Sequence, residues 1–509
     1  MIEVLPLKIY EYNLEIHISI HDFHRLFKSE SGFEFSSLEC YNYLTMNTLT
    51  TLLGTHDIAD LQKAVIAAPK TTTASGATVI SDALGQVDCV RYTDKGIEFQ
   101  SEGRAVSEPA DKDIILLTTS VSLCGTDIAL IDKAHKGALP AEAIGKVVGH
   151  EAAGVIVGVG AAVTNWHIGQ IVNLDSHFGC ARPDHHSFED CVASGKSCDG
   201  IAGGIRGALD ADGTTRLQPI DGYWSRIITV PESALPVEIP LAVATSLAAP
   251  STLESLGNIY MIIEQLDSIG VLAHASDTLC VVSGLGATGY PMAAVAAHYG
   301  CTVVGINPSA GKREFALKQG ACSAAYAKTS EAASHVEGKH QIVVIVTAGD
   351  AGAYQDALAF LDGLDSVKLG LTKKVLIAFG LFEDPAAPMP GAPAELNKTD
   401  GSPLPQRDFV FSRHHFGSAL GTEVYGVCGR NLAAWKRLMK DLMPTADASG
   451  MMAPPKLVAM LNEAQHQIKA ADPLHQIADE LNLGAAHVKE LLAASGKLKL
   501  VANLLTGTN

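Results

Sequence analysis

Residues 278–306 read TLCVVSGLGATGYPMAAVAAHYGCTVVGI, and this stretch decides the fold. It contains no Asp, Glu, Lys or Arg, and it is long enough to cross a bilayer as one helix. Small residues nevertheless divide it into a β-branched run, a turn and an Ala-rich run, with glycines at Gly284, Gly286, Gly289 and Gly300. We therefore predict a buried strand, a turn and a helix rather than a membrane span.

The turn within this stretch carries a G-x-G-x-x-G pattern formed by Gly284, Gly286 and Gly289. In a dinucleotide-binding loop the first glycine makes a tight turn and the second lets the backbone approach a pyrophosphate. The third lets the helix pack on the strand. The helix N-terminus then offers free N–H groups and its positive dipole end to the phosphates. We predict nucleotide binding here; the alternative is a plain turn between strand and helix.

Apolar runs and helical patterns alternate after this loop. TVVGIN, QIVVIVTAG and KKVLIAFG are further apolar runs, and SAGKREFALKQGA is typical of a helix. Strands that alternate with helices predict a parallel sheet with right-handed crossovers. We expect an α/β fold in which a doubly wound Rossmann cofactor domain spans residues 266–430.

The end of the second strand bears on the choice of cofactor. An acidic residue there would accept hydrogen bonds from the ribose hydroxyls of NAD, but this chain has Asn307, followed by Ser309. Asn carries no charge to repel a 2′-phosphate, and Lys312 or Arg313 could pair with one. The pattern favours NADP slightly over NAD, although both cations are also typical of a solvated first turn of helix.

Short β-rich segments dominate the part of the chain before the cofactor domain. RYTDKGIEF, DIILLTTSVSL and VVGHEAAGVIVGVG predict an antiparallel β-rich domain over residues 86–265. Within it, residues 177–213 form a Cys/His-rich lobe with little periodicity. We expect residues 1–85 to be an N-terminal extension and residues 431–509 to complete the β-rich domain.

Composition restricts the partners of this chain of 509 residues. Its 37 Lys and Arg against 55 Asp and Glu give a net charge of −18, which argues against nucleic acid or an anionic membrane. The N-terminal apolar stretch carries acids and histidines and lacks a basic lead, so we expect no signal peptide and a cytoplasmic protein. Ten cysteines in so long a chain do not indicate a disulfide scaffold.

Two polar clusters fall on expected turns of the β-rich domain. One begins at Cys124 in the run Cys-Gly-Thr-Asp, and the other consists of His150 and Glu151. Thiolate, imidazole and carboxylate are ligands that a catalytic zinc accepts, with one position left for water or substrate. Either cluster alone is weak; together, upstream of a dinucleotide loop, they predict a zinc centre.

These motifs resemble those of the zinc-dependent medium-chain dehydrogenase/reductase family, the alcohol, polyol and threonine dehydrogenases. The resemblance begins at about Val90 and rests on LCGTD, GHEAAGVIVGVGAAVTNWHIGQIV, SGLGATG followed by KREFALKQGA, and YGVCGR. It implies a GroES-like catalytic domain, Zn²⁺, NAD(P), and a homodimer or homotetramer. By the same resemblance Cys124 and His150 would be zinc ligands. Glu151 would bind the metal or lie just behind it, and Thr126 would pass on the substrate proton.

The chain departs from the family pattern at two places. Relatives usually supply another Cys or Glu ligand shortly before the cofactor domain, where this chain has SLAAPSTLESLGN. Either Glu254 takes that role, or water completes the metal shell, or the catalytic zinc is absent. Ala129 stands where many relatives carry a relay histidine, so the proton would leave through water or through His135.

The resemblance also implies a structural zinc in the Cys/His-rich lobe. Its ligands would be Cys180, His185, Cys191 and Cys198. The alternative is a degenerate lobe in which these cysteines are simple thiols. Arg430 would either reach the cofactor pyrophosphate or lie exposed at the start of a helix.

The sequence thus leads to one main hypothesis, a zinc-dependent oxidoreductase of the alcohol dehydrogenase type. It would transfer a hydride between NAD(P) and a small alcohol or polyol, or the corresponding carbonyl. Two alternatives stay open: a zinc-independent, NADPH-dependent quinone or enone reductase of the same fold, and a non-catalytic nucleotide-binding zinc scaffold.

Overall fold

The computed structural model divides the chain into two units, Met1–Leu52 and Leu53–Asn509. In the first unit, β1 (Val4–Ile9) pairs antiparallel with β2 (Leu14–Ser19). All other elements belong to the second unit. The structure describes residues 4–9, 14–19, 57–80, 83–139, 141–174, 206–209, 215–218, 221–232, 237–382, 384, 386–398, 400–446, 450–468, 470 and 472–505.

A seven-stranded sheet forms the centre of the part of the chain expected to bind a cofactor. Its strand order is β16-β15-β14-β17-β18-β20-β19, and every neighbouring pair is parallel except β19 with β20. The order reverses between β14 and β17, as in doubly wound dinucleotide-binding domains, and the predicted fold class is confirmed. The strands are β14 (Thr278–Ser283), β15 (Thr302–Ile306), β16 (Ala324–Tyr326), β17 (Gln341–Val346), β18 (Lys373–Ala378), β19 (His415–Gly417) and β20 (Glu423–Gly426).

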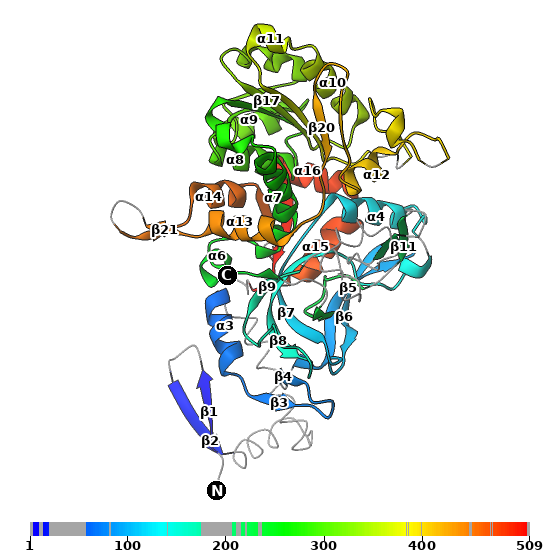
Figure 1. Ribbon diagram of the computed structural model, residues 1–509. Coiled ribbons are helices and arrows are strands. Elements are labelled where there is room, and N and C mark those ends of the chain that lie inside the picture. The colour runs from blue at the N-terminus through cyan, green and yellow to red at the C-terminus, as the bar shows by residue number, and fades with distance from the viewer. Residues whose placement is uncertain are drawn as a thin grey trace. The chain divides into compact units, whose positions relative to one another are not determined.

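Helices connect these parallel strands and pack against them. α8 (Gly289–His298) lies against β14 and β15, and α10 (Ala351–Asp362) lies against β17 and β18 (Figure 1). β14 and β17 are buried at every position, which explains their continuous apolar runs. The strand, turn and helix predicted for residues 278–306 are therefore confirmed. The other helices here are η5 (Leu272–Asp277), α9 (Ala310–Lys318), η6 (Thr329–His335), α11 (Ser366–Leu369), η7 (Ala394–Leu396) and α12 (Gln406–Phe411).

In the described part of the chain, no helix combines the length and the apolar character that crossing a membrane requires.

A nine-stranded sheet forms the centre of the β-rich domain. Its main path is β13-β9-β8-β7-β24-β23; β12 also pairs with β7, and the hairpin of β3 and β4 joins through β8. β7 is buried along nearly its whole length, and it pairs with β8, β12 and β24. The strands are β3 (Lys70–Thr72), β4 (Thr78–Ile80), β7 (Asp113–Ser122), β8 (Glu151–Val159), β9 (Ile171–Asn173), β12 (Ile227–Pro231), β13 (Val237–Glu238), β23 (Gln465–Ile468) and β24 (Lys499–Asn503).

Both ends of the second unit contribute to this sheet. β24 pairs antiparallel with β7, with Val501 opposite Ser122. β4 pairs with β8, with Thr78 opposite Val159. We expected the sheet to begin after residue 85; the structure includes residues 70–80 as well. These strands of three residues are too short to show an alternating pattern in the sequence.

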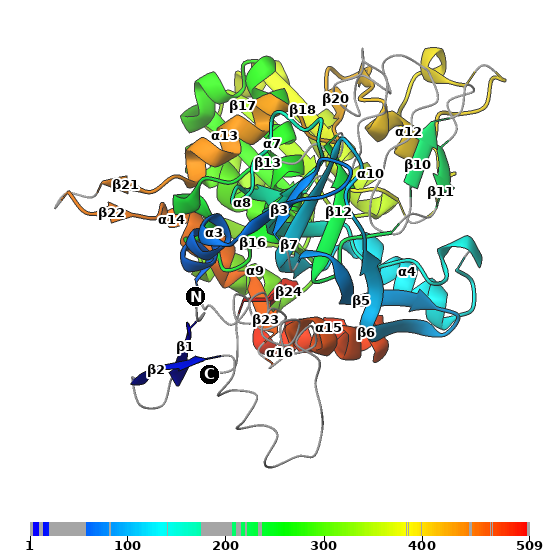
Figure 2. The ribbon, with the colours of Figure 1, turned by 90° about the horizontal axis from the view of Figure 1, so that it is seen from below.

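Further elements surround the two large sheets. β5 (Gly85–Thr93) and β6 (Gly96–Val106) form a long hairpin, and α15 (Pro473–Asn482) packs beside β6 (Figure 2). α7 (Leu253–Ser268) packs against α13 (Leu432–Leu442). The remaining elements are α3 (Ile58–Ala67), α4 (Gly125–His135), η2 (Ala141–Ala143), β10 (Arg206–Leu209), β11 (Thr215–Gln218), α6 (Leu241–Ala244), η4 (Pro250–Thr252), β21 (Thr445–Ala446), β22 (Met452–Ala453), α14 (Lys456–Glu463) and α16 (Ala485–Ser495).

Candidate functional site

Three predicted ligands, Cys124, His150 and Glu151, converge at one point of the β-rich domain. Their candidate ligand atoms all lie within 4.8 Å of one another. Cys124 caps the N-terminus of α4 just after β7, and Glu151 begins β8. Because β7 and β8 are antiparallel neighbours, with Ser122 opposite Glu151, the sheet brings the two distant turns together. We call these three residues the metal cluster.

The local backbone fixes the positions of Cys124 and His150 in the metal cluster. Oδ2 of Asp127 accepts a hydrogen bond from the backbone N–H of Cys124 at 2.9 Å, which closes the first turn of α4. Gly149 has a φ of +84°, and a Cβ there would lie 2.0 Å from Cδ1 of the buried Trp224. Only glycine permits this turn, and the turn sets the position of His150.

Asp127 also orients the imidazole of the metal cluster. Its Oδ1 lies 2.9 Å from Nδ1 of His150, and Asp127 is fully buried. A carboxylate can only accept, so Nδ1 carries a proton and Nε2 remains for a metal. Burial alone would lower the pKa of His150, but Asp127 and Cys124 outweigh it and raise that pKa well above its ordinary value.

Glu151 is fully buried and has two donors around its carboxylate. The hydroxyl of Ser122 donates to Oε2, and Nζ of Lys499 lies 2.8 Å from Oε1 and 2.7 Å from Oε2. Burial opposes the charge of Lys499, but Glu151 and Cys124 outweigh it and raise the pKa of Lys499 above its ordinary value. The ammonium group of Lys499 is therefore charged, and it contacts the metal cluster through Glu151.

Glu254, the uncertain fourth metal ligand of the sequence prediction, is not a member of the metal cluster. Its carboxylate forms a buried ion pair with Nη1 of Arg430, which also donates to the backbone carbonyl of Glu254 at 2.8 Å. In this structure the carboxylate of Glu254 is engaged by a guanidinium, so its role as a fourth metal ligand stays a prediction. The exposed helix start considered for Arg430 is wrong, because its side chain is completely buried.

Thr126 lies beside the metal cluster on the first turn of α4. Its hydroxyl oxygen is 3.9 Å from Sγ of Cys124. His135 ends the same helix, nine residues further on, and a rise of about 1.5 Å per residue puts it about 13 Å away along the axis. His135 is therefore too distant to receive a proton directly from Thr126.

The glycines of the predicted dinucleotide loop fill three distinct positions after β14. Gly284 has a φ of +99°, and a Cβ on Gly289 would lie 1.7 Å from the carbonyl oxygen of Gly284. A Cβ on Gly286 would meet no atom within 4 Å. The first and third glycines thus serve the turn and the packing of α8, whereas the second leaves open space beside the backbone. A dinucleotide loop requires this division of roles.

The residues predicted to contact the ribose lie just after β15. Asn307 is buried, and its Oδ1 accepts a hydrogen bond from the backbone N–H of Ser309 at 2.9 Å. Nη1 of Arg313 donates to the carbonyl oxygens of Asn307 and Pro308 at 2.7 and 2.9 Å. Arg313 is thus folded over the strand end, whereas Lys312 is exposed.

The predicted ligands of a structural zinc, Cys180, His185, Cys191 and Cys198, lie outside the described residues.

Sequence reasoning missed two residues that contact the metal cluster. Asp127 belongs to the Cys-Gly-Thr-Asp run, so its position in that run was a signal that we did not use. Lys499 lies on the last strand, and nothing in the local sequence links it to Glu151.

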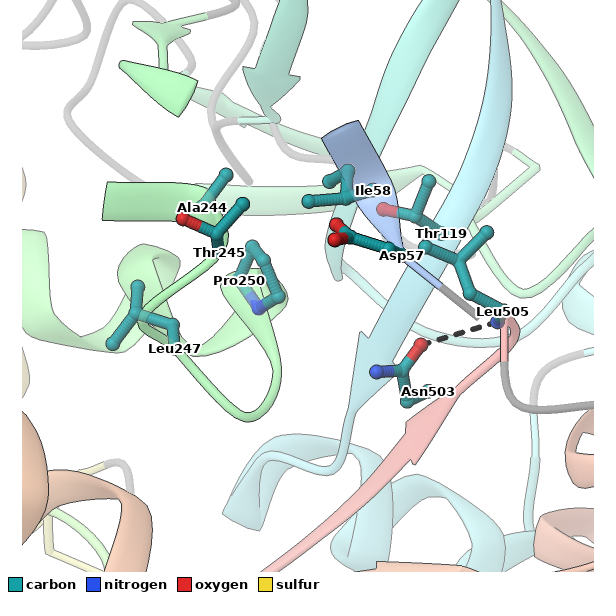
Figure 3. A pocket seen from close by; sticks show the side chains of 9 residues that line it. All are labelled: Asp57, Ile58, Thr119, Ala244, Thr245, Leu247, Pro250, Asn503 and Leu505. Carbon is teal, nitrogen blue, oxygen red and sulfur yellow. Dashed lines mark hydrogen bonds between the residues drawn. The ribbon is translucent and has the colours of Figure 1, made fainter. Parts of the chain in front are cut away.

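A separate pocket of about 300 Å³ lies elsewhere on the β-rich domain (Figure 3). Its one carboxylate, Asp57, caps α3 by accepting from the backbone N–H of Ala59 at 2.8 Å. None of the predicted site residues lines this pocket, and its carboxylate already serves as the cap of α3. The lining consists of Asp57, Ile58, Thr119, Ala244, Thr245, Leu247, Pro250, Asn503 and Leu505.

The β-rich domain matches a known family. Residues 110–240 match the alcohol dehydrogenase GroES-like domain. The NDMA-dependent alcohol dehydrogenase of Amycolatopsis methanolica is 30% identical over 257 residues, which cover 47% of this chain and 63% of that protein. The L-threonine 3-dehydrogenase of Rhizobium johnstonii is 28% identical over 225 residues, covering 43% and 56%. The NADP-dependent alcohol dehydrogenase C 1 of Mycolicibacterium smegmatis is 30% identical over 233 residues, covering 44% and 60%.

These alignments with curated relatives are partial. The chain spans between 56% and 63% of the length of the three relatives named above.

Solved structures of alcohol dehydrogenases share the fold over nearly their whole length. A cinnamyl alcohol dehydrogenase from Sorghum bicolor superimposes with a TM-score of 0.51 at 18% identity, covering 83% of this chain and 98% of that one. An alcohol dehydrogenase from Thermus sp. ATN1 gives a TM-score of 0.52 at 17% identity, covering 82% and 99%. The matched domain, the partly aligned relatives and the shared fold all point to the medium-chain alcohol dehydrogenase family.

Proposed function

We propose that this protein is an NAD(P)-dependent, zinc-containing oxidoreductase that interconverts a small alcohol or polyol and the corresponding carbonyl compound. The convergence of Cys124, His150 and Glu151 within 4.8 Å carries this proposal. The same chain has a doubly wound domain with a G-x-G-x-x-G loop, and its relatives are named alcohol and threonine dehydrogenases.

The donor set of the metal cluster suits zinc. A thiolate, an imidazole nitrogen and a carboxylate oxygen are all ligands that zinc accepts, and three protein ligands leave one position for substrate. Magnesium and calcium prefer an all-oxygen shell, which Cys124 and His150 do not provide. When bound, the zinc would supply Lewis acidity, which lowers the pKa of an alcohol hydroxyl.

The chain prepares these ligands for a cation. Cys124 is the N-cap of α4, so the first turn of this helix fixes the place from which the thiol faces the metal cluster. The hydrogen bond from Nδ1 of His150 to Asp127 directs Nε2 towards the metal cluster. Glu151 is held by its two donors, so all three groups are oriented before a ligand arrives.

The hydroxyl of Thr126 lies 3.9 Å from the thiol sulfur of Cys124. A hydroxyl can donate and accept at once, so it can pass the proton of a substrate alcohol to a neighbouring acceptor. His135 is too far along α4 to be that acceptor, and we therefore assign the next step of the relay to water.

We further propose that the dinucleotide binds where the strand order reverses, at the carboxyl ends of β14 and β17. The open space beside Gly286 accommodates the pyrophosphate. Hydride transfer itself is the chemistry of the nicotinamide. The uncharged Asn307 and the nearby Arg313 support NADP over NAD, because a 2′-phosphate would meet a guanidinium rather than a carboxylate.

The two alternatives from the sequence receive less support. A zinc-free quinone or enone reductase has no use for an oriented Cys, His and Glu within 4.8 Å of one another. A non-catalytic scaffold would not need Asp127 to orient His150, nor Thr126 beside the thiol.

Two measurements on the purified protein test the proposal. Elemental analysis should find zinc, and a panel of alcohols and carbonyls should reveal NADPH- or NADH-linked turnover that chelation of the metal abolishes. Full turnover without any metal would favour the zinc-free reductase. Tight dinucleotide binding without turnover on the whole panel would favour the scaffold.

A further inference from the structure

Lys499 is a buried cation that no part of the proposed hydride transfer uses. Its side chain is 8% exposed, and its Nζ contacts both oxygens of Glu151, at 2.8 and 2.7 Å. The same Nζ donates to the hydroxyl of Ser255 at 3.0 Å. One ammonium group thus links three elements, β24, β8 and α7.

The sheet explains how the two charges meet. Ser122 on β7 is opposite Glu151 on one side and opposite Val501 on the other. Lys499 precedes Val501 by two positions on β24, so both side chains project from the same face. Glu151 and Lys499 therefore reach each other across β7, on the face where the metal cluster lies.

A buried carboxylate needs a counter-charge. Glu151 has no exposed surface, and removal of an ionised carboxylate from water is strongly unfavourable unless it is paired. A hydrogen bond from Ser122 offsets only part of this cost. Without a metal ion, the positive charge in direct contact with this carboxylate is that of Lys499.

We propose that Lys499 is the internal counter-cation of Glu151: it holds the carboxylate beside the other two ligands and makes folding of the β-rich domain independent of metal binding. This role rests on the metal centre of the proposed function. Lys499 is a positioning residue, since its contacts are with Glu151 and Ser255 and not with a ligand atom of Cys124 or His150.

The test uses a variant that removes the charge but keeps the length of the side chain. In Lys499→Met, Glu151 is left buried without a counter-cation unless a metal takes over that part. We expect the melting temperature in EDTA to fall by about 10 °C, because breaking a buried ion pair leaves one charge buried without a partner. Added zinc should restore most of the loss. In the wild-type protein, the melting temperatures in zinc and in EDTA should differ much less than in Lys499→Met, because only the ordinary stabilisation by a bound ligand remains.

Three companion variants separate this role from a simple packing defect. Lys499→Arg keeps the charge and should behave like the wild type. Lys497→Met removes a partly exposed cation two residues earlier, which pairs with Glu463, and should change little. The double variant Lys499→Met, Glu151→Gln removes both charges, so it should regain stability in EDTA and lose the response to zinc. If Lys499→Met alone does not fold, a double variant that does fold still tests the role of the charge.

Equal responses of Lys499→Met and the wild type to EDTA and zinc would overturn the inference. So would a double variant as unstable in EDTA as the single one. Failure of the metal centre itself looks different: the wild type then contains no zinc by elemental analysis, and zinc does not restore Lys499→Met. In that case, a double variant that is more stable in EDTA than Lys499→Met still supports the counter-cation role in folding. A double variant that is no more stable overturns that role.

Discussion

Nδ1 of His150 lies 2.9 Å from Oδ1 of Asp127, and the other carboxylate oxygen of Asp127 accepts the backbone N–H of Cys124. One carboxylate therefore orients two members of the metal cluster, although they come from different strand ends. Since Asp127 is itself fully buried, it can do this only while both of its oxygens are satisfied.

Substitution Asp127→Asn should weaken the metal centre without unfolding the protein. The amide keeps one acceptor for the Cys124 N–H but loses the charge that holds the proton on Nδ1 of His150. We expect zinc affinity and kcat/KM to fall by about 10–100-fold, the usual cost of losing such a partner. Zinc content after dialysis and steady-state kinetics measure both. Asp132→Asn, an exposed change on the same helix that breaks a surface pair with Lys136, should leave both values unchanged.

Removal of the thiol should separate cofactor binding from chemistry. Cys124→Ala takes away one of three ligands, so turnover should be lost, while NADPH or NADH should bind with nearly unchanged affinity in a fluorescence titration. Cys301→Ala, at a partly buried thiol just before β15, is the matched control and should retain turnover. Normal turnover in Cys124→Ala would contradict the zinc mechanism.

The centre of the doubly wound sheet was predictable because β14, β15, β17 and β18 each carry an apolar run of their own. All six positions of β14 are buried, so the strand is an uninterrupted apolar run in the sequence. The glycine loop after it and the helix that follows are adjacent in the chain. The three members of the metal cluster could be predicted for the same reason, since each lies in a compact local motif.

The ion pairs around the site could not be predicted in this way. Glu151 meets Lys499 only because β24 returns from the end of the chain to pair with β7. Glu254 was a reasonable metal ligand by residue type, and its pairing with Arg430 depends on how α7 packs beside the segment before α13. Such contacts depend on strand pairing and helix packing between distant segments, for which a single sequence gives no pattern.

The three loop glycines should respond differently to substitution. Gly286→Ala places a methyl group in open space, so the melting temperature should stay the same while KM for the cofactor rises about tenfold, or about 1.4 kcal/mol. Gly284→Ala should instead destabilise the protein by about 1–3 kcal/mol, because φ is +99° and the Cβ would lie 2.8 Å from Oγ1 of Thr347. Gly311→Ala, in the exposed first turn of α9 with no atom near its Cβ, is the control for both measurements. An unchanged KM in Gly286→Ala would exclude the dinucleotide from this loop.

The choice between the two cofactors should depend on the charge at the end of β15. Asn307→Asp introduces a carboxylate beside the guanidinium of Arg313, whose Nη1 is 2.7 Å from the backbone carbonyl of Asn307. The new carboxylate repels a 2′-phosphate, so kcat/KM should fall with NADP. The same carboxylate can accept hydrogen bonds from the free ribose hydroxyls of NAD, so kcat/KM should rise with NAD. We expect the ratio of the two kcat/KM values to shift by about tenfold or more towards NAD, since about 1.4 kcal/mol is enough for that.

Arg313→Gln should shift the ratio in the same direction by weakening the binding of NADP alone, whereas Lys318→Gln, at the far end of α9, should not shift it. A wild-type protein that already prefers NAD, with no change in Arg313→Gln, would mean that Arg313 serves only to close the turn after β15.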